Sequence, residues 1–306
     1  MKIHRSKVHV MSVRRIALFV LLIFPASHAT WADGLPLWEV GVGLAGLNVP
    51  FYRGADQDKS YVLPLPYVIY RGERLKIDKS GIRGNIFSSD RVVLDFSLAG
   101  GVPVPKDEGG ARAGMPSLDT TLEVGPSLEI RLWKGGEINH DLWLHLPLRS
   151  AFSVGSSGIG HAGWILAPFV EYTWRNERRH ASWKANIAVG PIYADESYHD
   201  YFYTVDAAYV TTDRPAYQAS GGYSGSRVSV GVQRRIGDLW FGVFGRYDTL
   251  QGAVFTASPL VKTREYRAIG FAMTWVFLKS KTLVQDDRSL LEAQPNQDVP
   301  APARGE

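Results

Sequence analysis

Apolar residues alternate with small or charged residues along most of the chain after residue 32. In the segment 38–45, Trp38, Val40, Val42 and Leu44 fall on one face, and Glu, Gly, Gly and Ala lie between them. The segments 92–99, 122–132, 142–149 and 270–277 repeat the pattern. A period of two indicates β-strands with one apolar face. The sequence therefore predicts an all-β chain.

The length of these segments limits the fold classes that the chain can adopt. They run for about 10 to 14 residues, whereas strands of soluble proteins usually run for ~5–6 residues and membrane-spanning strands need ~9–11. After residue 32 there is no apolar run long enough for a membrane helix, and in lipid only helices and closed barrels satisfy every backbone hydrogen bond. We predict a transmembrane, antiparallel up-and-down β-barrel over residues 33–278. A β-sandwich and a secreted soluble barrel are the alternatives.

The connections between the segments alternate in length. The short ones are 71–73, 88–90, 134–140, 175–180 and 236–238, and the long ones are 102–119, 154–162, 194–224 and 250–262. Outer-membrane barrels have short periplasmic turns and longer external loops. The short connections are therefore predicted to face the periplasm.

The number of strands depends on one segment. The pattern gives eleven segments, near 36–49, 60–71, 74–87, 90–102, 120–133, 141–153, 163–175, 181–193, 225–235, 239–249 and 263–278. Bacterial single-chain barrels normally have an even number of strands. Ser80 and Gly81 interrupt the third segment, and glycine often marks a bend. Dividing that segment predicts twelve strands; ten is the alternative.

Several tryptophans lie near the short connections, where an aromatic girdle would meet the membrane interface. By their position in the alternation, Trp174, Trp183 and Trp275 face lipid, whereas Trp133, Trp143 and Trp240 face the lumen. The sequence therefore predicts a partial girdle.

The first 32 residues have the pattern of a secretory signal. Five basic residues precede the apolar stretch from Ile16 to Ala26, which has 11 residues and is shorter than the ~20 that a membrane helix needs. Small residues then offer cleavage after Ala29 or Ala32. The sequence predicts export to the outer membrane of a Gram-negative bacterium; a single N-terminal anchor is the alternative.

Removal of this segment changes the net charge from +4 to +4 − 5 = −1. The mature chain then has no basic excess to predict a nucleic-acid partner, and outer-membrane lipid is the expected environment. The chain has no Cys, which excludes disulfides and a thiolate nucleophile. Residues 279–306 leave the alternating pattern and are predicted to be a disordered periplasmic tail.

Charged residues with lumen-facing positions form the first candidate site. They could set the selectivity of a narrow pore, or they could pair with one another and fill the barrel. These residues are Glu123, Glu129, Arg131, His145, Arg149, Glu171, Arg175 and Lys184.

The segment 193–203 is the second candidate. It holds three carboxylates, one histidine and five aromatic residues, but its spacing matches no recognised metal site. We expect an external loop that folds over or into the barrel and contacts a ligand or acts as a plug. The candidate contacts are Asp195, Glu196, Tyr198, His199, Asp200, Tyr201 and Tyr203.

An acyl hydrolase would need Ser, His and a carboxylate to converge. His145, Ser127 and Glu129 are possible neighbours on adjacent strands, but no nucleophile elbow accompanies them. A polar network in the lumen is the favoured interpretation, and we predict no catalytic residue, cofactor or metal.

A series of short motifs runs from about residue 36 to 278. They include Trp38-Glu39-Val40-Gly41-Val42-Gly43, Pro50-Phe51-Tyr52-Arg53-Gly54-Ala55-Asp56, Gly114-Met115-Pro116-Ser117-Leu118-Asp119 and Gly221-Gly222-Tyr223-Ser224-Gly225. In number and order these motifs resemble the MipA/OmpV family of outer-membrane barrels.

The resemblance implies a non-catalytic scaffold that joins a lytic murein transglycosylase to a murein synthase. Other members of the family are described as porin-like or as adhesive surface antigens. A narrow porin-like channel and a surface antigen or adhesin are therefore the alternatives, and an outer-membrane lipid hydrolase is a third.

Overall fold

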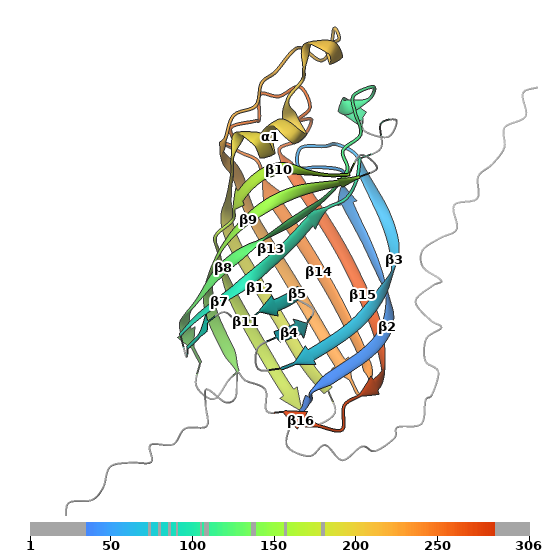
Figure 1. The fold of residues 1–306 in the computed structure, drawn as a ribbon, viewed down its shortest axis with the longest axis vertical. Coiled ribbons are helices and arrows are strands. Elements are labelled where there is room, and N and C mark those ends of the chain that lie inside the picture. Colours follow the sequence, from blue (N-terminus) through green and yellow to red (C-terminus); the bar gives the residue numbers. More distant parts are fainter. Residues whose placement is uncertain are drawn as a thin grey trace, which may run out of the picture. The chain divides into compact units, whose positions relative to one another are not determined.

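The computed structural model describes residues 35–72, 75–78, 81–84, 87–89, 91–104, 106, 110–135, 139–155, 158–178 and 181–284. One antiparallel sheet dominates this part of the chain (Figure 1). Its strands are β2 (Trp38–Pro50), β3 (Asp58–Arg71), β4 (Leu75–Asp78), β5 (Gly81–Gly84), β6 (Phe87–Ser88), β7 (Val92–Gly101), β8 (Thr120–Lys134), β9 (His140–Gly155), β10 (Gly158–Leu166), β11 (Phe169–Arg178), β12 (Ala181–Ala194), β13 (Gly222–Ile236), β14 (Leu239–Thr249) and β15 (Glu265–Lys279).

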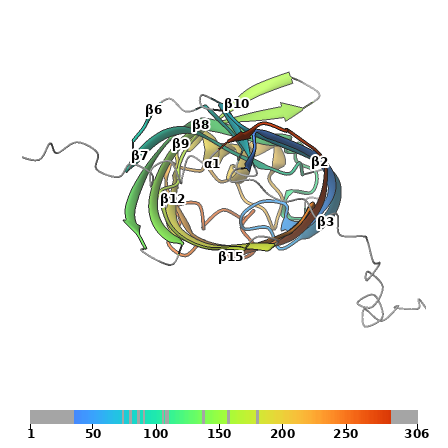
Figure 2. The same cartoon turned by 90° about the horizontal axis from the view of Figure 1, so that it is seen from below.

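The sheet closes into a barrel because its last strand returns to its first. β15 pairs with β2 over nearly its whole length, from Ile269 opposite Asn48 to Lys279 opposite Glu39. At the other junction β5 pairs with β4 and β6 pairs with β7, and only two residues separate β5 from β6 in the chain. β5 also lies against β7. Figure 2 shows the strands as a ring seen from below.

The interruption at Ser80-Gly81 is confirmed as the point that sets the strand number. β4 ends at Asp78 and β5 begins at Gly81, and the two pair antiparallel as a short hairpin. β10 and β11 lie in line between β9 and β12, with Ala167 and Pro168 between them, so they act as one strand. Proline has no N–H to donate and breaks the ladder there. With β5 and β6 counted together where the two ends of the sheet meet, the described residues form about twelve strands.

The alternation of the sequence is confirmed in the two faces of the strands. Along β8, Leu122 and Leu132 are exposed on the outside, whereas Thr121, Glu123 and Ser127 are buried toward the interior. On β15, Phe271, Met273 and Trp275 are exposed and Thr274 and Val276 are buried. An apolar outer face around a polar interior is the arrangement of a membrane barrel.

One expected loop is instead part of the sheet. The segment 154–162 was predicted to be a long connection, but β9 extends to Gly155 and β10 begins at Gly158. The pairs Gly158–Gly155 and His161–Phe152 continue the ladder as a hairpin. A β-bulge between His161 and Gly163 shifts its register.

The expected orientation of Trp133 is wrong for a similar reason. The ladder between β8 and β9 shifts between Arg131 and Trp133, so both Leu132 and Trp133 are exposed. A bulge adds one residue to a strand and reverses the side on which the next residue lies. Trp143 and Trp240 are buried on the interior side as predicted, and Trp183 and Trp275 are exposed outside.

The two ends of the barrel differ. At the end with the short turns, β1 (Leu35–Pro36) pairs with β16 (Leu283–Val284). β16 lies within the predicted tail. Residues 285–306 of that tail lie outside the described residues, as does the predicted signal segment. At the other end lie helix α1 (Glu196–Tyr203) and the 3-10 turns η2 (Gly110–Arg112) and η3 (Ala207–Tyr209). Among the described residues, no helix is long and apolar enough to span a membrane.

Gly43 offers a test of how closely β2 and β15 approach. A Cβ atom at Gly43 would clash with the backbone carbonyl of Met273 on β15, and a carbonyl within a ladder cannot swing aside. We expect Gly43→Ala to destabilise the barrel by about 1–3 kcal/mol, the usual cost of overpacking. Urea unfolding of the folded chain in lipid vesicles would measure the change.

Gly46→Ala is the matched control in the same strand. The Cβ there meets only the ring of Phe271, which is exposed on the outer face and can rotate. We expect a change within about 0.5 kcal/mol, as for substitutions away from packed sites. Equal effects of the two substitutions would contradict the close approach at Gly43.

Candidate functional site in the lumen and its outer cap

Helix α1 forms where the sequence predicted an external loop. Asp195 is its N-cap, and its carboxylate accepts a hydrogen bond from the backbone N–H of Tyr198 at 2.9 Å. This bond satisfies one of the free N–H groups of the first turn. Gly163 in β10 has φ +112°, and a Cβ there would clash with the backbone of Tyr198. The glycine thus lets α1 lie directly against the barrel wall.

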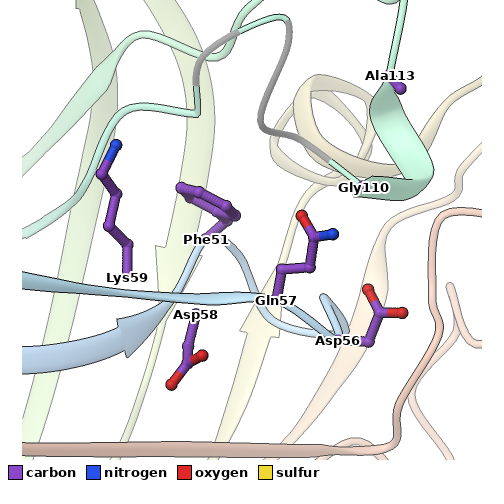
Figure 3. A pocket seen from close by; sticks show the side chains of 7 residues that line it. All are labelled: Phe51, Asp56, Gln57, Asp58, Lys59, Gly110 and Ala113. Atoms are coloured by element: carbon purple, nitrogen blue, oxygen red, sulfur yellow. The ribbon is translucent and has the colours of Figure 1, made fainter. Parts of the chain in front are cut away.

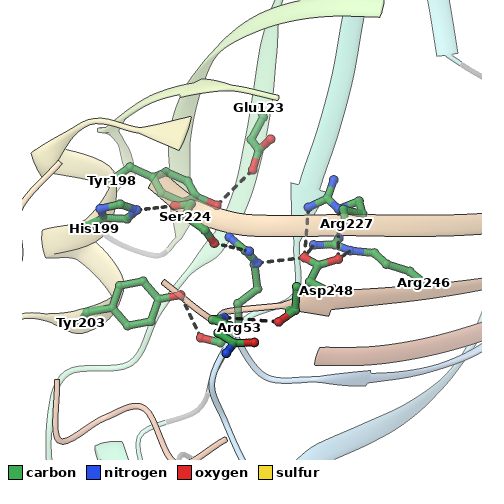
Figure 4. Close-up of polar contacts among 11 residues, drawn as sticks. Arg53, Glu123, Tyr198, His199, Tyr203, Ser224, Arg227, Arg246 and Asp248 are labelled. Atoms are coloured by element: carbon green, nitrogen blue, oxygen red, sulfur yellow. Dashed lines mark hydrogen bonds and ion pairs between the residues drawn. The ribbon is translucent and has the colours of Figure 1, made fainter. Parts of the chain in front are cut away.

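Three side chains of α1 bind three separate places around the mouth of the barrel (Figure 4). The Tyr198 hydroxyl donates to Glu123 of β8 at 3.3 Å. His199 bonds to Ser224 of β13 at 2.5 Å. The Tyr203 hydroxyl donates to the carbonyl of Arg53, between β2 and β3, at 2.8 Å. β8, β13 and β2 are separated from one another in the strand order, so the side chains of α1 reach different sides of the opening. Figure 2 shows α1 within the ring of strands.

His199 is fully buried, and its contacts determine which ring nitrogen carries the proton. Nδ1 lies 2.6 Å from the carbonyl of Ser220, which can only accept, so Nδ1 carries the hydrogen. Nε2 then accepts from the Ser224 hydroxyl. Burial lowers the pKa of His199 below its ordinary 6.5, because a buried site disfavours the charged imidazolium. The cap is therefore built around a neutral histidine.

Below the cap, Asp248 of β14 is enclosed by three arginines (Figure 4). Its carboxylate is fully buried and lies 2.9 Å from Arg53 Nε, 3.2 Å from Arg227 Nε and 2.6 Å from Arg246 Nη2. Arg227 faces Asp248 across the β13–β14 ladder, and Arg246 is two residues away on the same face. Arg53 also donates to the carbonyl of Ser224 at 2.5 Å, which links this cluster to His199.

A second ion pair joins the cap to β8 and β9. Arg149 Nε lies 3.0 Å from Glu123 Oε2, and both side chains are buried. Arg149 also donates to Ser97 of β7 at 3.3 Å. Glu123 thus accepts from Tyr198 with one oxygen and from Arg149 with the other. Two of the predicted lumen residues are brought together here with one residue of the predicted loop.

The other predicted lumen residues have partners of their own. His145 Nδ1 lies 3.3 Å from Glu129, and its ring stacks on Phe169. The guanidinium of Arg131 lies over the Trp143 ring. The rest are distributed along the wall: Arg175 pairs with Asp141 at 2.5 Å, Glu171 accepts from Thr173 and Asn186, and Lys184 of β12 faces Arg175 in the ladder.

A third cluster lies at the end with the short turns. Glu39 is fully buried, and its carboxylate lies 2.9 Å from Arg235 and 3.6 Å from Arg71. The Tyr67 hydroxyl donates to it at 3.4 Å. A charge this deep needs partners, because leaving it alone costs several kcal/mol. Both ends of the lumen therefore hold a carboxylate fixed by arginines.

The remaining residues of the predicted loop have structural contacts. The Asp200 carboxylate accepts from Thr204 at 2.7 Å and from Gln218 at 2.8 Å. The Tyr201 hydroxyl accepts from the Asp119 N–H at 2.9 Å, and Glu196 is exposed. Tyr203 stacks on the fully buried Phe255 at 3.8 Å between ring centroids. These contacts give the cap a small apolar core of its own.

The serine, histidine and carboxylate groups of the lumen and the cap have the following arrangement. Of the three residues considered as possible neighbours, Glu129 lies opposite His145 in the β8–β9 ladder, whereas Ser127 lies opposite Pro147. His199 and Ser224 do form a Ser-His pair, but both are fully buried and the third position holds the carbonyl of Ser220. Among the described residues, no cluster of three or more potential ligands could hold a metal ion.

A cavity of about 600 Å³ opens beside the loop between β2 and β3 (Figure 3). Its lining includes the acidic Asp56 and Asp58 together with Gln57 and Lys59. A second cavity, of about 390 Å³, lies between η2, α1 and η3. Both belong to the loop end of the barrel, and the lumen clusters lie beneath them.

The sequence-based selection missed Arg53, Arg227, Arg246, Asp248 and Glu39. The positions of Arg246 and Asp248 alternate in phase with the buried Trp240, so the period of β14 could have placed them in the lumen. Arg53 lies outside the strands, in the motif Pro50-Phe51-Tyr52-Arg53-Gly54-Ala55-Asp56. Only the folded loop shows that it reaches Asp248.

The family model described as "MltA-interacting protein MipA" matches residues 42–277, which is most of the barrel. The chain belongs to this family. The match covers the strands of the lumen clusters and the whole of the cap.

Two curated relatives are outer-membrane proteins. The chain is 26% identical to outer membrane protein Omp26La of Vibrio anguillarum over 72% of this chain and 80% of the relative. It is 25% identical to outer membrane protein OmpV of Vibrio cholerae serotype O1 over 87% of this chain and 100% of the relative.

Solved structures with a similar course of the chain are more distant. A bacterial polysaccharide outer membrane secretin has 10% identity and a TM-score of 0.38, with 81% of this chain and 100% of that chain covered. The CymD monoaromatic hydrocarbon channel has 10% identity and a TM-score of 0.32, with 81% and 89% covered. Likenesses this weak carry nothing about function.

The buried neutral His199 makes the stability of the cap depend on pH. Its pKa is lowered in the folded cap, so the cap binds fewer protons than the opened segment, in which a histidine titrates near 6.5. The stabilisation is complete above that value and falls as the pH drops below it. Hydrogen exchange of the α1 amides should therefore be faster at pH 5.5 than at pH 7.5, after correction for intrinsic rates.

His199→Gln provides the control, because an amide can donate to Ser220 and accept from Ser224 without titrating. We expect the pH-dependent part of the exchange to disappear in this variant. Acid-accelerated exchange that persists unchanged would assign the effect to other groups.

Proposed function

We propose that this chain is a non-catalytic outer-membrane barrel with a closed lumen, and that it binds murein-remodelling enzymes at its short-turn end. It is exported by the N-terminal signal, cleaved after Ala29 or Ala32, and its outer face is covered by lipid. The long loops and α1 then face the cell exterior, and the turns with β1 and β16 face the periplasm.

The fixation of α1 is the observation that carries this proposal. The helix is tied to β8, to β13 and to the connection between β2 and β3 by Tyr198, His199 and Tyr203. Beneath it the charged side chains bind one another, as in the Asp248 and Glu123 clusters. A lumen occupied by paired ions has no row of free charges to conduct solutes. The surfaces at the two ends of the barrel are then the places where a partner can bind.

The choice of the proposed partner rests on the family to which the chain belongs. The description of the family model, MltA-interacting protein MipA, names MltA as a partner of the protein it describes. Applied to this chain, it supports a lytic murein transglycosylase, and with it a murein synthase, as partners on the periplasmic side. The turns between β8 and β9 and between β13 and β14 lie at that end, within reach of an enzyme that works on murein.

A narrow channel is the second candidate, and one observation favours it. The side chains of Arg227 and Arg246 retain 30% and 26% exposure although both bind Asp248. Partly accessible arginines beside the lumen would favour anions if the cap moved aside. A surface antigen or adhesin would use the long loops, which are compatible with either candidate.

Capture of the partner tests the scaffold directly. The full chain, purified in detergent and immobilised, should retain a lytic murein transglycosylase from solubilised membranes, identified by mass spectrometry. Glu196→Ala, an exposed change at the opposite end of the barrel, should capture equally well. A barrel of another family in the same detergent should capture none; retention of the enzyme by both barrels, or by neither, would count against the scaffold.

Conductance distinguishes the closed barrel from the channel. The full chain in planar lipid bilayers should give no stable ohmic steps at neutral pH, because α1 and the ion pairs occupy the lumen. The folded state of the inserted protein is checked by its heat-dependent migration in SDS gels. Reproducible ohmic steps, absent from bilayers without protein, would overturn the closed lumen and favour the channel.

A further inference from the structure

The cavity of about 390 Å³ at the loop end is lined by an arginine that has no acidic partner among the described residues. Arg112, the last residue of η2, is buried. Its Nη1 donates to the carbonyl of Phe202 at 2.9 Å, and its Nη2 makes only a 3.5 Å contact with the carbonyl of Pro116. Its Nε has no hydrogen-bond partner in the part of the chain that the structure describes. A buried guanidinium with neutral partners alone is an expensive arrangement.

A second guanidinium adds to the positive charge. Arg214 donates to the carbonyls of Tyr209, Ala111 and Ala113 at about 3 Å, and it too has no salt bridge among the described residues. Burial, with Arg214 as a further contribution, lowers the pKa of Arg112. An anionic group that entered the cavity would supply the missing counter-charge.

The rest of the cavity wall is suited to hydroxyl groups. Asp206 is exposed and makes no capping bond to η3, so its carboxylate is available as an acceptor. The Asp200 carboxylate is held in place by Thr204 and Gln218 and keeps further acceptor capacity. Sugar hydroxyls donate well to carboxylates, which accept charge-assisted hydrogen bonds.

Two tyrosines complete the wall. Tyr201 and Tyr209 both line the cavity, and the hydroxyl of Tyr201 is already bound to Asp119. Its ring is thus held in position. The C–H face of a pyranose packs on aromatic rings of this kind, and the cavity lies within the usual range of ~300–1,000 Å³ for small-molecule sites.

From these features we propose that the cavity between η2, α1 and η3 binds a sugar that carries a carboxylate. The carboxylate lies toward Arg112, the hydroxyls donate to Asp200 and Asp206, and the ring packs on the tyrosines. A simple anion would be repelled by the two aspartates, and a neutral sugar would leave Arg112 unpaired. Only a ligand with both an acid group and hydroxyl donors satisfies the whole wall. The site does not depend on the scaffold role.

Saturation-transfer NMR on the full chain in detergent micelles tests the proposal with three probes at equal concentration: D-glucuronate, D-glucose and acetate. We expect transfer to the ring protons of glucuronate, and at least tenfold weaker binding of glucose and acetate. Equal binding of glucose would overturn the role of Arg112, equal binding of acetate would reduce the cavity to an anion site, and no binding of glucuronate would overturn the proposal.

Variants locate the binding. Arg112→Gln should weaken glucuronate binding by about tenfold or more, the scale of a lost charge-assisted hydrogen bond. Arg267→Gln removes an equally charged but exposed side chain that pairs with Glu265, and it should bind as the unchanged chain does. Should Arg112→Gln fail to fold, Tyr209→Ala serves instead and should also weaken binding. Glucuronate binding that is unaffected in a folded variant of either kind would place it elsewhere.

Discussion

A carboxylate with no exposure to water must be paired, and in this barrel that requirement ties the wall to the loops. Asp248 has three arginine partners. Arg227 and Arg246 come from the paired strands β13 and β14, but Arg53 comes from the connection between β2 and β3. Breaking a buried ion pair typically costs ~3–5 kcal/mol. The loop that carries Arg53 is therefore held against the wall by the charge balance of the lumen, and Ser224, His199 and Tyr203 extend that attachment to α1.

The same logic explains why the cap is ordered although its helix is short. An eight-residue helix is marginal in water, since nucleation costs more than a few hydrogen bonds return. Here Asp195 caps the first turn, Gly163 permits contact with β10, and Phe255 packs on Tyr203. Each of these contacts comes from a different stretch of the chain. The cap is thus a tertiary structure that only the closed barrel can support.

Features that depend on local sequence could be predicted, whereas features that depend on contacts between distant parts of the chain could not. The alternation of β8 and β9 is local, and it predicts that Glu123 and Arg149 face the lumen. The break at Ser80-Gly81 is also predicted from local sequence, together with the even number of strands expected of a barrel. The bulge beside Trp133 depends on how two strands pair, and one inserted residue reverses the side chain that follows. The hairpin at 154–162 and helix α1 likewise depend on partners distant in sequence. Asp195 before Glu196 was a readable N-cap signal, but nothing local shows that His199 will meet Ser224.

Buried charges are paired differently in the lumen and in the loop layer. Inside the lumen each carboxylate that the structure describes as fully buried, Glu39 and Asp248, is matched by arginines. Arg112 departs from this rule, because it is buried in the loop layer with no carboxylate partner among the residues that the structure describes. Such a position costs stability unless something offsets it, and η2 has no other feature that requires an arginine rather than a neutral donor. The exception lies outside the barrel wall, beside a cavity, where a ligand can reach it. The ion pairs fill the lumen, so the barrel serves as a rigid support. Arg112 belongs to the surface of the loops that this support holds in place.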